Sequence, residues 1–72
     1  MMSLRGDITR KNIMEVIEKY TSKNGFSPTL REIGDLAGIK STATVHGHLQ
    51  KLKKQGKLDW NPTQPRTIRR VS

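Results

Sequence analysis

The middle of the chain carries two helix signals that lie close together, and their spacing limits the folds available to it. Thr29, followed three residues later by Glu32, forms the pattern of a capping box at the start of a helix. Gly38 ends this helix after about two turns, and Ser41 can cap a new one only three residues later. The core-facing positions of the first helix are expected to be Leu30, Ile33, Leu36 and Ala37. Such a pair is typical of a helix-turn-helix, although helical hairpins of this length also occur as plain packing units.

A longer helical pattern precedes this pair. After a short lead-in over residues 1–8, Thr9 can cap a helix over 9–24 that stops at Asn24-Gly25. Phe26 is an apolar residue in the connector that follows, and we expect it to fold back onto the core. The buried face of the helix is predicted to consist of Ile13, Val16, Ile17 and Tyr20.

The rest of the chain predicts one more helix and a basic hairpin. The helix covers 41–55 and stops at Gly56, and strands are expected over 57–60 and 66–71. Pro62 and Pro65 cannot donate ladder hydrogen bonds, so the loop over 61–65 should protrude. The predicted fold class is mainly α with a small β-hairpin, a three-helix winged helix-turn-helix. It forms a single domain over 1–72, with helices at 9–24, 29–37 and 41–55 and a wing at 57–71.

Positive charge is concentrated in the second half of the chain. The whole sequence has 14 Lys and Arg against 6 Asp and Glu, a net charge of +8. Residues 1–39 carry six positive and five negative charges, whereas residues 40–72 carry eight positive charges and one negative. A one-sided excess favours a polyanionic partner over a mixed solvated face. A membrane surface fits less well because the basic half lacks a large apolar face, so nucleic acid is the expected partner.

Composition excludes several other classes of protein. The absence of cysteine rules out disulfides, thiolate metal sites and a cysteine nucleophile. The two histidines, His46 and His48, point to different sides of a helix, so neither a metal site nor another cofactor is expected. No Ser/His/Asp grouping, paired carboxylates or Gly-rich phosphate loop is present in the sequence, so we do not expect the protein to be an enzyme. No apolar run approaches a membrane span or a signal-peptide core, which predicts a cytoplasmic protein.

One face of the third predicted helix has no explanation in packing. Its core face consists of Val45, Leu49 and Leu52, and the opposite stripe of Ala43, Gly47, Gln50 and Lys54. Gly47 costs about 1 kcal/mol relative to alanine in a helix interior, and it lies nearly opposite the core. Poor helix propensity without a packing reason is expected where a backbone comes close to a large partner. The small residues at the start of this helix would let it enter the major groove, with its N-terminus near phosphate.

Side chains along the same helix suggest individual roles. His46 is long enough to reach a base edge, although it could also be an ordinary surface histidine. Gln50, Lys51 and Lys54 lie where the helix would leave the groove and approach phosphates. His48 is interpreted as a half-buried packing residue.

The wing contributes further candidates. Arg66, Arg69 and Arg70 are expected to contact phosphate, and their spacing does not decide which of them do so. Trp60 is interpreted as a packing residue of the wing in preference to one that stacks on a base.

Three stretches of the chain carry a resemblance to a known family. They are residues 27–34 (SPTLREIG), residues 41–49 with TVHGHL at 44–49, and residues 61–66 (NPTQPR). Over residues 7–71 the chain resembles the N-terminal DNA-binding domain of LexA repressors, particularly of Gram-positive bacteria. The resemblance implies a three-helix winged domain that binds a GAAC-type inverted-repeat operator as a dimer. It also implies repression of DNA-damage genes, the SOS response, with the third helix in the major groove. Such a protein would be associated with the nucleoid of a bacterial cell.

The resemblance also assigns contacts position by position. It implies a base-proximal set consisting of Ser41, Ala43, Thr44, His46 and Gly47. It implies contacts to the DNA backbone, or to the minor groove from the wing turn, by Thr29, Arg31, Asn61, Gln64 and Arg66. Together with Gln50, Lys51 and Lys54, these residues form the predicted interface with double-stranded DNA.

The chain also departs from the family pattern. Repressors of this family continue into a second domain that dimerises and cleaves itself with a serine–lysine pair, whereas this chain stops after the wing. We therefore expect no self-cleavage, a monomer in isolation and two copies on DNA. An excised domain and a naturally short regulator are both compatible with the sequence. The tryptophan at position 60, followed by Asn61, is unusual for the wing.

A different class of function remains as the alternative. A winged-helix protein-interaction module that docks an acidic partner would also suit the basic charge. Protein-docking surfaces more often expose aromatic or methionine anchors than a glycine and a hydroxyl-rich helix start. The residues around Gly47 therefore favour DNA over an acidic protein.

Overall fold

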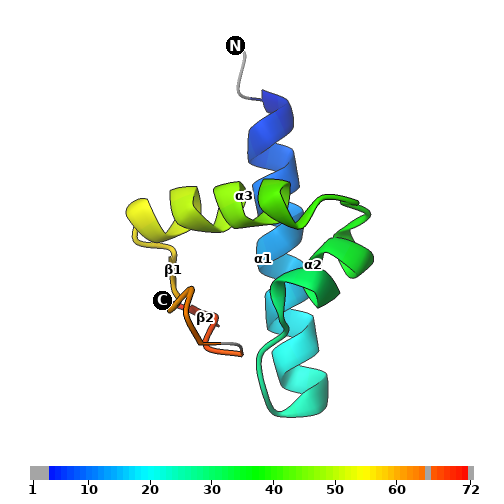
Figure 1. Ribbon diagram of the computed structural model, residues 1–72, viewed down its shortest axis with the longest axis vertical. Coiled ribbons are helices and arrows are strands. Elements are labelled where there is room, and N and C mark those ends of the chain that lie inside the picture. Colours follow the sequence, from blue (N-terminus) through cyan, green and yellow to red (C-terminus); the bar gives the residue numbers. More distant parts are fainter. Residues whose placement is uncertain (1–3, 65, 72) are drawn as a thin grey trace.

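The computed structural model describes residues 4–64 and 66–71 and contains, over these residues, three helices and a two-stranded antiparallel sheet (Figure 1). The helices are α1 (Leu4–Asn24), α2 (Leu30–Ala37) and α3 (Thr42–Lys54). The strands are β1 (Leu58–Asp59) and β2 (Arg69–Arg70). This is the winged helix-turn-helix that the sequence predicts.

Helix α1 is longer than predicted. It begins at Leu4 and continues through Thr9, so the expected lead-in and cap are wrong over the described residues. Leucine and arginine at positions 4 and 5 are good helix formers, and a capping residue inside a continuous helix does not end it. Residues 1–3 of the predicted lead-in lie outside the described part of the chain, as does Pro65.

The start of α2 confirms the predicted capping box. The Thr29 hydroxyl accepts a hydrogen bond from the Glu32 backbone N–H at 3.2 Å. In return, the Glu32 carboxylate accepts one from the Thr29 N–H at 2.9 Å. Helix α2 ends at Gly38, which adopts the left-handed conformation (φ 75°) and donates its N–H to the Gly34 carbonyl.

The turn between α2 and α3 depends on a second glycine. A Cβ atom at Gly34 would lie 2.8 Å from the Ile39 carbonyl oxygen and 3.4 Å from a Val45 methyl group. Glycine therefore allows the turn to pass close over α2. Helix α3 then begins with Ser41 as its cap, whose hydroxyl accepts from the Thr44 N–H at 3.3 Å, as predicted.

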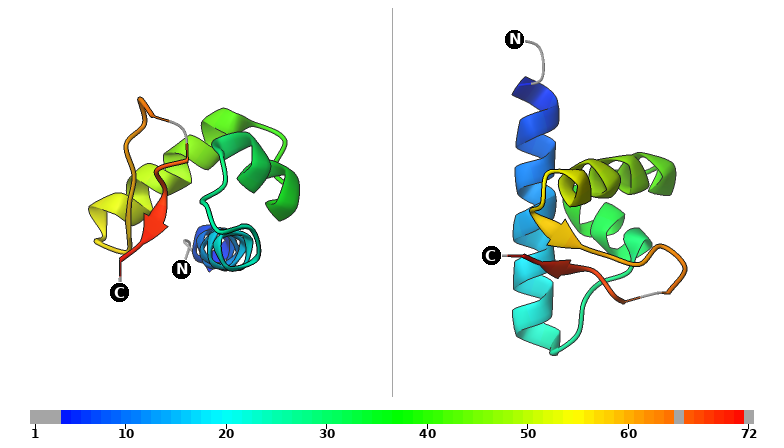
Figure 2. Two further views of the ribbon diagram at one scale, coloured as in Figure 1. Left: turned by 90° about the horizontal axis from the view of Figure 1, so that it is seen from below. Right: turned by 90° about the vertical axis from the view of Figure 1, so that its left-hand side faces the viewer.

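The strands of the wing are shorter than predicted. Leu58 pairs with Arg70 and Asp59 with Arg69, and the expected strand residues outside these pairs are turn or irregular structure. One cause is Arg66, which has φ 60° and cannot continue a strand. Figure 2 shows the loop that joins the strands extending away from the body of the domain.

The core lies between the three helices and the base of the wing. Its buried apolar side chains are Ile13, Ile17, Ile33, Val45, Leu49, Leu52, Leu58, Trp60 and Ile68. Two predicted core positions are wrong, because Leu36 is 60 % exposed and Phe26 is 48 % exposed. Leu36 lies in the last turn of α2, and the other apolar residues of this helix, Leu30, Ile33 and Ala37, lie in or against the core. The Phe26 ring instead packs edge-to-face against Tyr20 at 5.9 Å between centroids.

The start of α3 and the wing turn occupy the side of the molecule that lies away from α1. Both views in Figure 2 place α1 on one side, with the wing turn and the start of α3 projecting away from it. No helix within the described residues is long and apolar enough to cross a membrane.

Candidate nucleic-acid interface

The first half of α3 presents a surface of small, exposed residues. Ser41, Ala43, Thr44 and Gly47, four members of the predicted base-proximal set, are all exposed. Apart from its two chain neighbours and the nearby backbone of α3 itself, a Cβ atom at Gly47 would have no atom of the domain within 4 Å. Packing within this chain therefore does not require glycine at position 47. Farther along the same helix, the predicted phosphate contacts Gln50, Lys51 and Lys54 are exposed as well.

His46 is the one member of the base-proximal set that packs inside the domain. It is half-buried, and its imidazole meets the Trp60 indole edge-to-face, with ring centroids 4.9 Å apart and an interplanar angle of 75°. Trp60 itself is only 4 % exposed, which confirms it as a packing residue of the wing. Base contact by His46 stays a prediction. The structure adds that one side of its ring packs against the wing.

His48 lies on the other side of α3 and is half-buried, in agreement with the packing role predicted for it. Burial lowers the pKa of this imidazole, and the positive charges of Arg10 and Lys51 lower it further. The neutral form is therefore favoured in the folded protein.

A groove separates the wing from the N-terminal ends of α2 and α3. Its lining includes the apolar side chains of Leu30, Trp60 and Ile68. Its polar lining brings together residues that are distant in sequence, namely Thr29, Arg31, Thr42, Gln64 and Arg66. Four of these five are predicted backbone contacts. Two helix N-termini and two basic side chains along one groove suit a chain of phosphates.

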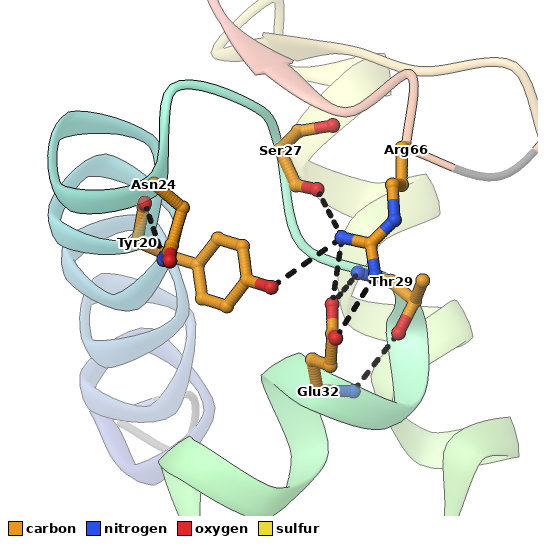
Figure 3. Close-up of polar contacts among 6 residues, drawn as sticks. All are labelled: Tyr20, Asn24, Ser27, Thr29, Glu32 and Arg66. Carbon is orange, nitrogen blue, oxygen red and sulfur yellow. Dashed lines mark hydrogen bonds and ion pairs between the residues drawn. The ribbon is translucent and has the colours of Figure 1, made fainter.

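The Arg66 side chain forms hydrogen bonds with α1, with α2 and with the connector between them (Figure 3). Its guanidinium forms two parallel hydrogen bonds with the Glu32 carboxylate, at 3.0 and 3.1 Å. It also donates to the Ser27 carbonyl oxygen at 3.0 Å and to the Tyr20 hydroxyl at 3.4 Å. Its central carbon lies 4.8 Å from the Phe26 ring centroid. Arg66 thus connects the wing to the start of α2 and to the connector before it.

The contacts of Arg66 change the electrostatics of Glu32. The hydrogen bond from the Thr29 N–H and, next, the bond from Arg66 lower the pKa of Glu32 to about 2. Sequence reasoning identified Glu32 as a capping residue but missed its ion pair. The two partners are 34 residues apart, and no local spacing relates them.

The wing turn is closed by its own side chains. The Asn61 carboxamide oxygen accepts from the N–H of Thr63 at 3.0 Å and from its hydroxyl at 2.7 Å. The Thr67 hydroxyl donates to carbonyl oxygens of Asn61 and Gln64. Asn61 and Gln64, both predicted to contact DNA, are exposed, and the Asn61 amide donates to the Gln64 side chain at 3.4 Å. These bonds fix the shape of the turn that the two residues present.

Charge is distributed differently over the wing and α3. Arg69 pairs with Asp59 at 3.3 Å, and Arg70 pairs with Glu18 of α1, so all three wing arginines have a carboxylate neighbour. Helix α3 carries Lys51, Lys53 and Lys54 and no acidic residue. Among the described residues, none of these lysines forms an ion pair, and the Lys53 ammonium donates to the Trp60 carbonyl oxygen at 2.8 Å.

Taken together, a capped helix-turn-helix, an exposed basic α3 with small residues at its start and an adjacent wing define a winged helix-turn-helix DNA-binding domain. The model of the family described as the LexA DNA-binding domain matches residues 8–67. The chain belongs to this family.

Relatives of the chain agree with this assignment. It is 46 % identical over 57 residues to a LexA repressor of Pediococcus pentosaceus, covering 79 % of this chain and 27 % of that protein. It is 42 % identical over 67 residues to a LexA repressor of Caldicellulosiruptor saccharolyticus, covering 90 % and 33 %. For a LexA repressor of Brevibacillus brevis the identity is 45 % over 60 residues, covering 83 % and 29 %. The chain therefore spans about a third or less of the length of these relatives.

Proposed function

We propose that this chain is the DNA-reading part of a transcriptional repressor, and that it binds double-stranded DNA sequence-specifically with α3 in the major groove. The observation that carries the proposal is Gly47, an exposed position within α3 where an added Cβ would contact nothing in the domain outside α3. A glycine that weakens its own helix and is not needed for packing is accounted for by a partner surface that approaches the backbone closely.

The surrounding residues divide into two groups by the contacts they would make. Base edges would face the exposed start of α3, where the proposed set is Ser41, Ala43, Thr44, His46 and Gly47. Phosphates would follow the groove beside the wing and the later turns of α3, where the proposed set is Thr29, Arg31, Gln50, Lys51, Lys54, Asn61, Gln64 and Arg66. Base contacts would supply sequence preference, and phosphate contacts most of the affinity.

Arg66 would reach phosphate from its place beside Glu32. Its guanidinium has five N–H donors, and the bonds to Glu32, Ser27 and Tyr20 leave it at the edge of the groove. An arginine whose orientation is fixed by a carboxylate can present a remaining donor to a phosphate oxygen from one direction.

Two copies of the domain would bind an inverted-repeat operator, one on each half-site. The exposed face of α3 is available for one half-site per chain, and a two-fold operator matches two identical chains. A repressor of this kind would act on DNA-damage genes in the bacterial cytoplasm, as the resemblance to LexA repressors implies.

Fluorescence anisotropy with labelled duplexes tests the proposal. One duplex carries the GAAC-type inverted repeat and the other a scrambled version, and each is titrated at several salt concentrations. We expect the repeat to be preferred by roughly tenfold or more, with a steep salt dependence of both affinities. Equal binding would contradict sequence reading of this repeat, and no binding at low salt would favour the alternative of an acidic protein partner.

A further inference from the structure

Trp60 connects the wing to α3 at two points. Its indole meets the His46 imidazole edge-to-face, and its backbone carbonyl accepts a hydrogen bond from the Lys53 ammonium at 2.8 Å. His46 and Lys53 are seven residues apart, which is two turns along the same side of α3. A residue of the wing is therefore fixed along one side of the helix proposed to read DNA.

Contacts within the wing hold Trp60 in place. Its side chain is 4 % exposed, and its backbone N–H donates to the Asp59 carboxylate at 2.9 Å. The next residue, Asn61, donates its backbone N–H to the Thr67 hydroxyl at 3.0 Å, which ties the two arms of the wing together. The indole can therefore serve as a fixed surface for the ring that lies against it.

The His46 imidazole needs such a surface if it is to distinguish one base from another. An exposed histidine on a helix samples several rotamers, and each rotamer directs its ring nitrogens to a different place. Ordering the ring on binding costs conformational entropy, and a ring that is already ordered avoids this cost. Here the imidazole is half-buried and packs on one aromatic neighbour, 4.9 Å away between centroids.

We propose that Trp60 is a positioning residue for sequence recognition, because its indole holds the His46 imidazole in one orientation beside the exposed start of α3. This inference rests on the proposed function and adds to it a residue that itself touches no base. Sequence preference at the base pair that His46 faces would then depend on a wing residue, and the wing and α3 would engage DNA as one body.

Selection from random-sequence duplexes tests the inference whatever the operator sequence is. The wild-type chain, Trp60→Leu, Trp60→Phe and His46→Ala are each used to enrich bound duplexes, which are then sequenced. We expect His46→Ala to reduce the preference at a small number of base pairs in each half-site by roughly fivefold or more. Trp60→Leu should reduce the preference at those same base pairs, and Trp60→Phe, which keeps a smaller ring, should give an intermediate loss.

A control variant separates positioning from general weakening of the wing. Leu58→Val trims a buried side chain in the same wing, and Leu58 neither lines the groove nor is the ring partner of His46. It should leave the selected sequence unchanged even if total affinity falls. Folding of every variant is checked by far-UV circular dichroism, and if Trp60→Leu does not fold, Trp60→Phe decides.

The outcomes distinguish this inference from the proposed function. If the wild-type chain enriches no sequence, the proposed function fails and the inference fails with it. If the wild-type chain enriches a sequence but folded Trp60 variants enrich the same one with undiminished preference, only the inference is overturned. Loss of preference at base pairs other than those affected by His46→Ala, or equally at all positions, also overturns it.

Discussion

At the scale of single residues, two glycines inside helices have opposite roles. A Cβ at Gly47 would contact nothing in the domain outside α3, whereas a Cβ at Gly34 would lie 2.8 Å from the Ile39 carbonyl oxygen. Gly47 stands out in the sequence because it lies opposite the apolar face of the helix. Gly34 does not stand out in this way, because helical spacing does not show how closely the turn after α2 passes over this position.

Replacement of Gly47 should change stability and DNA binding in opposite directions. We expect Gly47→Ala to raise the free energy of unfolding by about 1 kcal/mol, since alanine is the better helix former and space is open.

We expect Gly47→Glu to remain folded and to lose operator binding, because a long acidic side chain would stand between α3 and the DNA. Thermal unfolding followed by circular dichroism and anisotropy titration measure the two effects. A folded Gly47→Glu variant with near-normal affinity would contradict the placement of α3 in the groove.

Replacement of Gly34 by alanine should reduce stability instead. The new methyl group would push against backbone, and such overpacking costs about 1–3 kcal/mol, which exceeds the gain of about 1 kcal/mol in helix propensity. The same unfolding measurement is compared directly with Gly47→Ala. Equal stabilisation by both substitutions would show that the turn does not pass as close to α2 as the structure indicates.

At the scale of elements, the local signals of α2 and α3 were predictable and the joins between elements were not. The caps at Thr29 and Ser41 and the stop at Gly38 depend on neighbours within four residues, and the structure confirms them. The bonds of Arg66 to Glu32 and Ser27 span 34 and 39 residues, and the sequence offers no periodicity that would reveal them. The same limit explains Phe26, whose partners are Tyr20 and Arg66 at the surface and not the core.

The contacts between the wing and α2 should make stability depend on acid pH. The pKa of Glu32 is lowered from 4.5 to about 2 in the folded protein, so the carboxylate stabilises the fold above about pH 5. This stabilisation is lost as the pH falls from about 5 towards 2. Glu32→Gln keeps a side chain that can accept the Thr29 N–H bond but cannot ionise. Its unfolding midpoint should lie below that of the wild-type chain at neutral pH and approach it near pH 2.

A matched variant guards against a general effect of removing a carboxylate. Glu15→Gln removes one negative charge from α1, at an exposed position in the described structure. It should leave the pH dependence of unfolding close to that of the wild-type chain. A difference between wild type and Glu32→Gln that persists unchanged down to pH 2 would show that the ionised form is not what stabilises the wing.

At the scale of the whole molecule, the positive charges of the second half of the chain differ in their surroundings between the wing and α3. The excess of positive charge in residues 40–72 predicted a polyanionic partner but not its division between wing and helix. In the fold, wing arginines pair with Glu32, Asp59 and Glu18 from three different elements, while α3 has lysines without acidic neighbours in its own sequence. Pairing across elements depends on the tertiary arrangement, which a count of charges does not contain.

This division predicts how affinity depends on salt. Lys54→Ala should weaken binding to specific and scrambled duplexes alike and reduce the slope of log affinity against log salt by about one unit. Lys23→Ala changes net charge equally but lies in the last turn of α1, and its slope should match that of the wild-type chain. Anisotropy titrations at four or more salt concentrations give both slopes. Equal changes for the two variants would mean that affinity follows net charge and not the lysines of α3.

The paired arginines of the wing also bear on the order of events as a complex forms. A close pair of opposite charges has a field that fades quickly with distance, and beyond about 8–10 Å salt screens what remains. A duplex arriving from solution would therefore be drawn first by the lysines of α3, and the association rate constant should respond mainly to them. The wing arginines, each beside a carboxylate, would come within reach of phosphate only once the helix is seated. Their contribution would then appear in the dissociation rate constant, and so in the lifetime of the complex.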